Sequence, residues 1–540
     1  MAGDSEDCTP ITECDAGQWV SVQDGAWDDA ATWGGDDIPG NCAEVEIAHA
    51  VTAAACTISG ASPASYSPGA ETSPALKVTV DGSLLLPAGA TLVSRGDAHL
   101  LGPMTMAEGS SLELDASQAA DPSNTEYRLL IESTWNIYDT AKLVINGSEN
   151  KRCAVRSNPG GGSGRILAAY KTGIFAPNVG SKSGGRIIAV FTDFSGFGSA
   201  EKTGWHFRAD VSGAEVRVTD STFTAFGEIV QNYTSIAGAS VIFERNVWMA
   251  SIPSNVKKSI FRPSSGQAAT MSIKNNSFDA LVYLFGTVGA VIEDNVFGGG
   301  LQIHPNLPGG GQWASFRHNM IRQPKEGESG FGMRYGQKFL DNVYIMDYAG
   351  WNPHYLAVMH GTGETHVTGN VFWFTGPQNP PPGAEGDGVR PGPPDSGTYD
   401  DNHIIVEKNI FLPNGNGPDG TNNLSTTILT ILVENANKRI SVHRNTVFTN
   451  GSGGCAIGET GITAAGNLFA VKSNLFVGDI NNTGYKIHNL NYAATDAVLA
   501  QDADYNGCWR CFDGSNFMDG AGKGYDGLSF SGSELIGAND

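Results

Sequence analysis

The chain has 540 residues, with 56 Asp and Glu against 33 Lys and Arg and a formal net charge of −23 at pH 7. This excess of negative charge opposes nucleic-acid binding, because contact with phosphates requires a basic face. Apolar residues make up 40% of the chain, which argues against disorder, and 70 glycines favour strands and tight turns over helices.

Residues 1–16 are predicted to be an N-terminal tail. Their sequence, MAGDSEDCTPITECDA, has neither the basic nor the apolar region of a secretory signal peptide. We therefore expect that any export signal has been removed or never existed. No segment approaches the roughly 20 continuous apolar residues that cross a bilayer, so we predict no membrane span.

The eight cysteines favour an exported protein, found outside the cell, at its surface or in a periplasm. Disulfides near the two ends are the preferred interpretation, because close pairs of cysteines are typical of such proteins. The CWRC sequence at 508–511 leaves redox or zinc chemistry as alternatives, although no βαβ pattern or second CxxC supports them. The close pairs are Cys8/Cys14, Cys42/Cys56 and Cys508/Cys511, while Cys153 and Cys455 are isolated.

Residues 17–125 are rich in tryptophan and glycine and are predicted to form a β-rich N-terminal cap. The open end of a stack of strands needs a cap, because it exposes unpaired edge groups. The residues that make this pattern are Trp19, Gly25, Trp27, Trp33, Gly34, Gly35, Pro39, Gly82 and Gly89. The pattern resembles the tryptophan- and glycine-rich domain, named for its eight glycines, of secreted β-helix proteins such as the cell-surface hyaluronidases. A carbohydrate-binding module is the alternative.

A repeated motif, apolar-x-x-Asn-x-Phe or another apolar residue, dominates the rest of the chain. Its spacing varies from 19 residues to 39 residues, and each unit holds short β-branched runs broken by Gly, Asn and Asp. We expect each unit to be one coil of a β solenoid. The asparagine would tolerate a left-handed backbone and bond to its equivalents about 4.8 Å away, with the aromatic residue pointing inward. The motif asparagines are Asn246, Asn276, Asn295, Asn319, Asn342, Asn370, Asn409, Asn445 and Asn474.

Irregular coils with inserted loops resemble the right-handed parallel β-helix of the pectate-lyase-like superfamily, over about residues 180–510. The predicted fold is therefore all-β, a right-handed parallel β-helix solenoid over residues 126–510. Residues 511–540 are expected to form a C-terminal cap or tail. Two residues before the asparagines, charges of alternating sign in four consecutive coils predict a solvated structural face, and these are Glu244, Lys274, Glu293 and Arg317.

Residues 299–375 concentrate histidine, arginine, lysine and aromatic residues as no other stretch does. Lys338 and His366 both lie four residues before a motif asparagine, and Arg334 and His360 lie further upstream in the same two coils. We therefore expect a cationic group and an imidazole to meet on one face across adjacent coils.

Elimination from a uronic acid polymer needs a cation beside the carboxylate, a base for the C5 proton and an acid for the leaving oxygen. Related β-helix lyases use Lys, Arg, His or Tyr for these roles, often with calcium. By this resemblance Arg334 would neutralise the carboxylate, His360 or Lys338 would be the base, and Tyr335 the acid.

Sugar-binding residues are expected in the same region, beside a proline- and glycine-rich loop between Asn370 and Asn409. Asp400 and Asp401 are a candidate calcium site, and no other cofactor is expected. Zinc at His354, His360 and His366 is disfavoured by their spacing. Structural roles are the alternative, with His318 and His366 in or beside turns. The candidate sugar-binding residues are Trp351, His354, Tyr355, Trp373 and Arg322.

The sequence favours an extracellular polysaccharide as partner and a lyase as the function. A hydrolase on the same fold is the first alternative, although it needs two carboxylates roughly 5 to 9.5 Å apart. A non-enzymatic carbohydrate-binding, adhesive or structural protein is the second. The oligomeric state is left open.

Overall fold

The computed structural model describes residues 18–39, 44–47, 50–52, 57–59, 77–80, 83–86, 91–94, 98–100, 104–106, 108–115, 126–131, 134–137, 140–157, 173–176, 185–195, 205–209, 213–224, 228–232, 240–249, 261–263, 270–279, 282–285, 290–304, 315–323, 331–333, 338–346, 356–359, 363–374, 385–392, 402–412, 425–432, 438–448, 455–460, 468–477, 486–490, 503–504 and 507–509.

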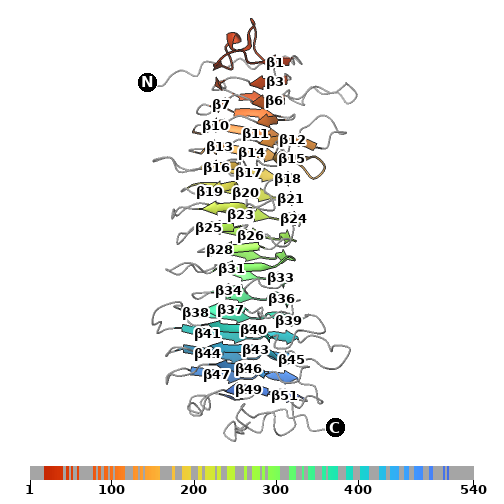
Figure 1. Ribbon diagram of the computed structural model, residues 1–540, viewed down its shortest axis with the longest axis vertical. Helices are drawn as coiled ribbons and strands as arrows, with labels where there is room; N and C mark the ends of the chain where they lie inside the picture. The colour runs from red at the N-terminus through yellow and green to blue at the C-terminus, as the bar shows by residue number, and fades with distance from the viewer. Residues whose placement is uncertain are drawn as a thin grey trace. The chain divides into compact units, whose positions relative to one another are not determined.

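The chain divides into two compact units, residues 1–277 and 278–540, with the boundary inside β27 (Ser277–Phe278). Both units contain the same repeating element, a coil of three short strands that we assign to sheets A, B and C in chain order. Figure 1 shows these strands in both units.

Unit 1 contains the first coils of the chain. Its sheet A consists of β1 (Gln18–Val20), β3 (Glu44–Ile47), β6 (Lys77–Val80), β9 (Ala98–Leu100), β12 (Glu126–Ile131), β15 (Arg152–Ser157), β18 (Thr192–Ser195), β21 (Thr222–Thr224) and β24 (Val247–Met249). Sheet B consists of β2 (Gly25–Ala26), β4 (Ala50–Thr52), β7 (Ser83–Leu86), β10 (Met104–Met106), β13 (Thr134–Ile137), β16 (Gly173–Ala176), β19 (Trp205–Ala209), β22 (Glu228–Asn232) and β25 (Phe261–Pro263). Sheet C consists of β5 (Thr57–Ser59), β8 (Thr91–Ser94), β11 (Ser111–Asp115), β14 (Lys142–Asn146), β17 (Arg186–Val190), β20 (Glu215–Thr219), β23 (Ser240–Glu244) and β26 (Thr270–Lys274).

Unit 2 repeats the arrangement, except that its second strands form two separate groups. Its sheet A consists of β30 (Val296–Phe297), β33 (Met320–Gln323), β36 (Val343–Met346), β39 (Val371–Phe374), β42 (Ile410–Leu412), β45 (Thr446–Phe448), β48 (Leu475–Val477) and β51 (Gly507–Trp509). The second strands are β28 (Val282–Phe285) with β31 (Leu301–His304), and β34 (Phe331–Met333), β37 (Leu356–Met359), β40 (Glu385–Gly392), β43 (Ser425–Leu432), β46 (Cys455–Thr460) and β49 (Lys486–Leu490). Sheet C consists of β29 (Val291–Glu293), β32 (Ser315–Arg317), β35 (Lys338–Leu340), β38 (Gly363–Thr368), β41 (Asn402–Glu407), β44 (Lys438–His443), β47 (Leu468–Lys472) and β50 (Ala503–Asp504).

The pairing of these strands defines the fold. Within each unit, from β3 onward, a strand pairs in parallel with the strand of its sheet three places later in the chain, as β11 does with β14 and β38 with β41, whereas β1 and β2 pair with β3 and β4. Successive side chains alternate between buried and exposed faces, so that Leu143 and Ile145 are buried while Val144 between them is partly exposed. The predicted all-β parallel β-helix is confirmed.

The motif asparagines form hydrogen-bonded ladders inside each unit, as the sequence predicts. Asn409 is fully buried, donates from Nδ2 to Val367 O (2.8 Å) and Asn445 Oδ1 (2.9 Å), and accepts at Oδ1 from the backbone N and the Nδ2 of Asn370 (2.9 and 3.0 Å). The same pattern links Asn246 with Asn276 in unit 1. In unit 2 it links Asn295, Asn319, Asn342, Asn370, Asn409, Asn445 and Asn474.

The left-handed backbone does not occur at the asparagines, which corrects that part of the prediction. It occurs one residue earlier, where the N–H continues the main-chain ladder; Lys408, for example, donates to His443 O (3.1 Å). The preceding residue therefore makes the turn, and the asparagine points inward and satisfies buried polar groups. The left-handed residues that precede motif asparagines are Arg245 and Asn275 in unit 1, and Asp294, His318, Asp341, Gly369, Lys408, Arg444 and Ser473 in unit 2.

The apolar residue two places after each asparagine fills the interior, as expected. In unit 2, Phe372 and Phe411 are almost fully buried and stack in neighbouring coils, with ring centroids 4.9 Å apart and planes inclined by 8°. Stacked rings at coil spacing join the coils by dispersion and burial of apolar area.

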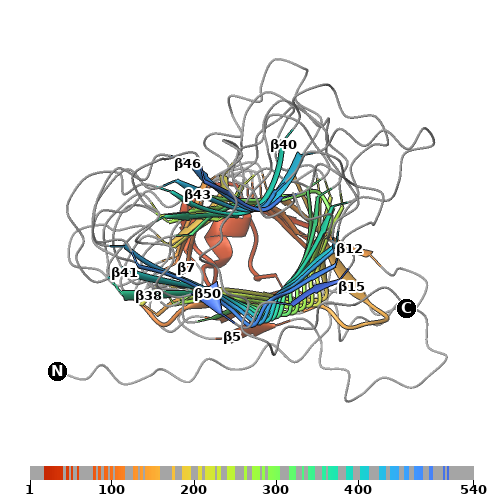
Figure 2. The same cartoon turned by 90° about the horizontal axis from the view of Figure 1, so that it is seen from below.

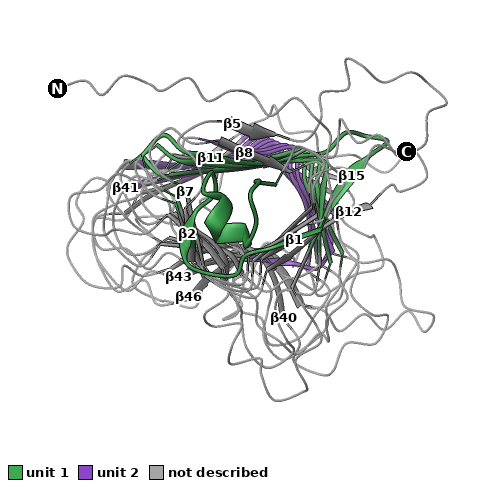
Figure 3. Ribbon diagram, turned by 90° about the horizontal axis from the view of Figure 1, so that it is seen from above, with its two compact units in different colours: residues 1–277 green, residues 278–540 purple. Residues whose placement is uncertain are grey.

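A separate β-rich cap over residues 17–125 is not confirmed. Strands β3 to β11 pair in parallel with the next coils of unit 1, in the same way as the later strands of that unit. The distinct element is the 3-10 helix η1 (Ala30–Trp33), which lies beyond β1 in Figure 1 and inside the ring of unit 1 strands in Figure 3. Trp27 and Trp33 are buried there with ring centroids 5.1 Å apart, and Trp33 Nε1 donates to Trp27 O (2.8 Å).

The described part of the chain contains one of the predicted isolated cysteines with its side chain. Cys153 is buried in unit 1 as a thiol whose Sγ lies 3.9 Å from Leu114 O, in agreement with its isolated place in the sequence. The side chains of the predicted disulfide pairs lie outside the described residues, as do residues 511–540.

Gly369 makes its left-handed turn where an added side chain would be crowded. Its φ is +72°, and an added Cβ would overlap the Asp341 carboxylate of the preceding coil. Gly369→Ala is therefore expected to lower the free energy of unfolding by about 1 to 2 kcal/mol for the left-handed backbone, plus the cost of moving Asp341. Denaturant unfolding of Gly369→Ala and of Gly369→Ala with Asp341→Ala measures both parts. Equal loss in both variants would show that the overlap costs nothing.

Candidate functional site

Sheet C of unit 2 places Lys338 and His366 side by side. The two residues are direct partners in the parallel pairing of β35 with β38, and the alternating Phe339 and Val367 are fully buried. Lys338 is exposed and His366 partly exposed, so both lie on the outward face. The prediction that a cationic group and an imidazole share one face of adjacent coils is confirmed for this pair.

One carboxylate connects two imidazoles on this face. Glu364 Oε2 lies 3.3 Å from His366 Nε2 in the same strand, and Glu364 Oε1 lies 3.7 Å from His403 Nδ1 in the next coil. Glu364 and His403 are direct partners in the pairing of β38 with β41, which Figure 2 shows side by side. The Glu364 side chain is 62% exposed and the two imidazoles are 25% and 29% exposed, so all three are open to solvent.

A serine hydroxyl completes the group. Ser441 Oγ in β44 lies 2.7 Å from His403 Nε2, and Ser441 is 9% exposed. We call the five residues Lys338, Glu364, His366, His403 and Ser441 the β38 cluster.

Glu364 selects the tautomer of each imidazole. A carboxylate only accepts hydrogen bonds when ionised, so it favours a proton on His366 Nε2 and on His403 Nδ1. The remaining nitrogens, His366 Nδ1 and His403 Nε2, then carry lone pairs and can take a proton. The cluster therefore holds two candidate general bases, one open and one bonded to Ser441.

Of the predicted sugar-binding residues, the structure describes Arg322 and Trp373. Arg322 is exposed on β33, and Trp373 is 46% exposed on β39, outward of the buried Phe372. Their assignment to sugar binding stays a prediction. The predicted residues outside the described part of the chain are Arg334, Tyr335, Trp351, His354, Tyr355, His360, Asp400 and Asp401.

Two histidines test the structural alternatives. His318 occupies a left-handed turn position with φ of 55°, as that alternative expected. His366 does not lie in or beside a turn but within β38, three residues before Gly369. Its strand position places its imidazole on the outward face, next to Lys338.

Sequence reasoning missed His403 and Ser441, and it considered Glu364 only as one of the carboxylates available to a hydrolase. Their spacing could have predicted the pairing of Glu364 with His403, because each lies six residues before a motif asparagine, Asn370 and Asn409. The described residues contain no group of three or more His, Cys, Asp and Glu side chains arranged to hold a metal ion.

The predicted structural face is also on sheet C, two residues before the asparagines. In unit 2, Arg317 Nε lies 2.8 Å from Glu293 Oε1 on the neighbouring strand. In unit 1, Glu244 and Lys274 are direct pairing partners. This charged column is a cross-strand ladder, as expected.

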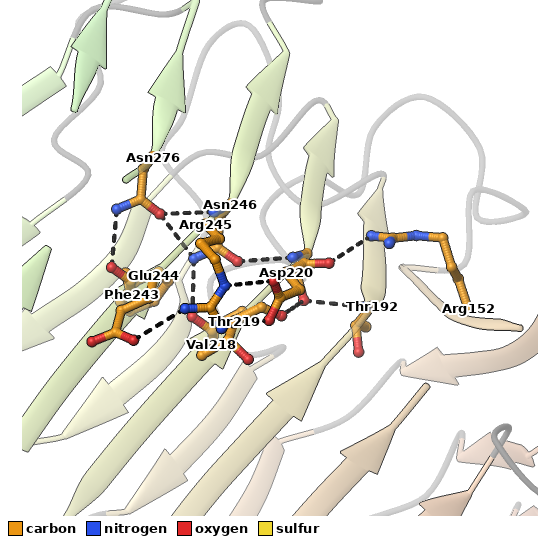
Figure 4. A network of polar contacts seen from close by, with 11 residues as sticks. Arg152, Thr192, Val218, Thr219, Asp220, Phe243, Glu244, Arg245, Asn246 and Asn276 are labelled. Carbon is orange, nitrogen blue, oxygen red and sulfur yellow. Dashed lines mark hydrogen bonds and ion pairs between the residues drawn. The ribbon is translucent and has the colours of Figure 1, made fainter. Parts of the chain in front are cut away.

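A second polar network lies in unit 1, at the turns between sheets C and A (Figure 4). Arg245 donates to both carboxylate oxygens of Asp220, from Nε (2.7 Å) and Nη2 (2.8 Å). Arg152 donates to Asp220 O (3.0 Å) and Asp193 Oδ1 (2.8 Å). The hydrogen bonds from Arg245 lower the pKa of Asp220 below its ordinary value of 3.8, against a smaller effect of burial. These hydrogen bonds and ion pairs join the turns of neighbouring coils, so we assign the network a structural role.

The Asp220–Arg245 pair predicts a defined pH dependence. Because the pKa of Asp220 is lower in the folded protein than in the unfolded chain, the pair stabilises unit 1 above pH 3.8 and this contribution disappears as pH falls through the lowered pKa. Arg245→Met is expected to cost about 0.2 to 1 kcal/mol at neutral pH, because Arg245 is exposed, and nothing in strong acid. Urea unfolding of both proteins across the acid range measures the difference. A loss that is independent of pH would contradict the assignment.

The pairing of its strands places the chain among parallel β-helix proteins. No protein family model matches the chain, and no curated protein sequence matches it. Within the described residues, no helix has the length and apolar character that a bilayer crossing requires.

Proposed function

We propose that the protein is an extracellular enzyme that cleaves a uronate-containing polysaccharide by β-elimination. The observation that carries the proposal is the direct pairing of Lys338 with His366 on an outward face, with Glu364 bonded to the imidazole. A similar use of outward side chains belongs to the pectate-lyase-like enzymes that the repeat resembles.

The β38 cluster supplies two of the three groups that elimination needs. The Lys338 ammonium neutralises the uronate carboxylate, which makes the adjacent C5 proton more acidic. His366 Nδ1 takes that proton while Glu364 holds Nε2–H. The electron pair of the C5–H bond forms the C4–C5 double bond, and the C4–O4 bond breaks. The leaving oxygen takes a proton from an acid, for which Tyr335 remains the candidate.

Elimination fits the cluster better than hydrolysis does. Hydrolysis uses two carboxyl groups roughly 5 to 9.5 Å apart, whereas the β38 cluster contains one carboxylate, two imidazoles and an ammonium group. A non-enzymatic adhesive or carbohydrate-binding role is the other candidate, and the assay below distinguishes it.

Several further features belong to this proposal. Disulfides at the cysteine pairs near both ends suit a protein that works outside the cell. Trp351, Trp373, His354, Tyr355 and Arg322 would contact the sugar, and the exposed ring of Trp373 suits stacking on a pyranose. Calcium at Asp400 and Asp401 would assist by binding substrate carboxylates.

The test is the ultraviolet absorbance of the unsaturated product during incubation with polygalacturonate, alginate and hyaluronate, with calcium or with a chelator. We expect a rise with one of these polymers and a fall in rate of about 100-fold or more in Lys338→Ala, because the ammonium faces charge that develops during reaction. Lys408→Ala, which removes an exposed ammonium at a turn of unit 2, is the matched control. Binding without absorbance or new reducing ends would instead support the non-enzymatic role.

A further inference from the structure

Ser441, His403 and Glu364 are arranged as a nucleophile, a base and a group that orients the base. Ser441 Oγ lies 2.7 Å from His403 Nε2, and Glu364 Oε1 lies 3.7 Å from His403 Nδ1. A serine becomes nucleophilic when an adjacent imidazole can take its proton and a third group fixes the imidazole, and these contacts are often looser without substrate. The three residues come from three successive coils of sheet C in unit 2, β38, β41 and β44.

The positions of the protons in this group leave His403 able to accept the proton of Ser441, as catalysis requires. The Glu364 carboxylate, 3.7 Å from His403 Nδ1, favours a proton on that nitrogen, so His403 Nε2 has the lone pair and the Ser441 O–H donates to it. The elimination proposed above uses His366 and Lys338, and it leaves the Ser441 hydroxyl without a role.

Ser315, another outward serine of sheet C, makes a direct hydrogen bond to a carboxylate and serves as a comparison for Ser441. Ser315 lies four residues before Asn319, as Ser441 lies four residues before Asn445, and its Oγ donates directly to Glu293 Oε1 (2.7 Å). That hydroxyl bonds a carboxylate with no imidazole between them. Ser441 differs because an oriented imidazole separates its hydroxyl from the carboxylate.

We propose that Ser441 is the nucleophile of an esterase site that removes small acyl groups, such as acetyl, from hydroxyls of a carbohydrate. Ser441 Oγ attacks the ester carbonyl carbon as its proton passes to His403 Nε2. The tetrahedral intermediate collapses, the bond to the sugar oxygen breaks, and that oxygen takes the proton from His403. Water then attacks the acyl-serine with His403 as base, which releases the carboxylic acid and restores the Ser441 hydroxyl.

The burial of Ser441 limits the size of the acyl group. Ser441 is 9% exposed, whereas His403 is 29% exposed and Glu364 is 62% exposed. A flat acetyl group on a sugar hydroxyl needs only a narrow approach, whereas a long acyl chain would need apolar surface to bind. The site therefore fits short acyl esters on a large polar alcohol.

The experiment treats the full-length protein with a fluorophosphonate probe, which bonds covalently to activated serines, and identifies the labelled residue by peptide mass spectrometry. We expect labelling at Ser441, abolished in Ser441→Ala and slowed about 100-fold or more in His403→Gln. Ser315→Ala is the matched control and should label as the unchanged protein does. The rate of hydrolysis of 4-nitrophenyl acetate, measured in the same variants, should rise and fall in parallel with the labelling rate.

Labelling that persists in Ser441→Ala, or that is absent from the unchanged protein, overturns the proposal and leaves the contacts as a surface hydrogen-bond ladder. Glu364→Gln guards against a folding artefact, because it keeps the shape of the side chain and should still reduce the labelling rate. Unfolding midpoints of all variants confirm that they fold. The elimination assay is separate, so failure of either activity leaves the other testable.

Discussion

Asn409→Ala is expected to lower the free energy of unfolding by about 3 to 5 kcal/mol. The substitution removes two hydrogen bonds that the Asn409 amide donates, to Asn445 and Val367, and two that it accepts from Asn370. Asn409 is fully buried, so water cannot replace these partners. Each buried group left unpaired costs about 1 to 3 kcal/mol, and relaxation of the coils recovers part of the sum.

Lys408→Ala is the matched control, because Lys408 precedes Asn409 in the same turn and is exposed. Its ion pair with Glu407 (3.6 Å) contributes little at the surface, so a change below about 0.5 kcal/mol is expected. Denaturant unfolding gives the energies, and amide hydrogen exchange at Asn370 reports the local effect, since its N–H loses the acceptor on Asn409. A loss below about 1 kcal/mol with exchange at Asn370 unchanged would show that the ladder is dispensable.

The ladder also explains how much of the fold was accessible from the sequence. One amide that both donates to and accepts from its own copy in the next coil explains a repeated asparagine, and the stacked Phe372 and Phe411 explain the aromatic residue after it. The left-handed residue was assigned one place too late, because asparagine is itself common in that conformation. Its position before the asparagine is occupied by residues as different as Lys408 and Gly369, so no residue type marks it.

Only the part of the candidate site that has a fixed spacing to the motif asparagines could be predicted from the sequence. Lys338 and His366 share one offset and pair directly. Ser441 also lies four residues before its motif asparagine, but its pairing partner in β41 is Ile405 and not His403. Its contact with His403 reaches two residues along the neighbouring strand, so spacing in the sequence does not predict it. Arg334 and His360 lie outside the described residues, so the spacing argument for them stays a prediction.

His366→Ala is expected to lower the rate of elimination by about 10² to 10⁴-fold, which is the usual contribution of a positioned general base. The imidazole stands on the outward face beside Lys338, and Glu364 holds its Nε2 at 3.3 Å, which leaves Nδ1 to take the C5 proton. His318→Ala is the matched control, since His318 is an exposed imidazole that also faces a carboxylate, with Nδ1 3.5 Å from Asp294 Oδ1.

Steady-state rates on the polymer that gives the unsaturated product measure the effect, with the turnover number separated from the Michaelis constant. Loss of a base lowers the turnover number, whereas loss of a binding contact raises the Michaelis constant. A large fall in turnover in His366→Ala alone assigns the base. Equal effects in His366→Ala and His318→Ala would contradict the assignment and move the base to His360, the histidine that the sequence favoured.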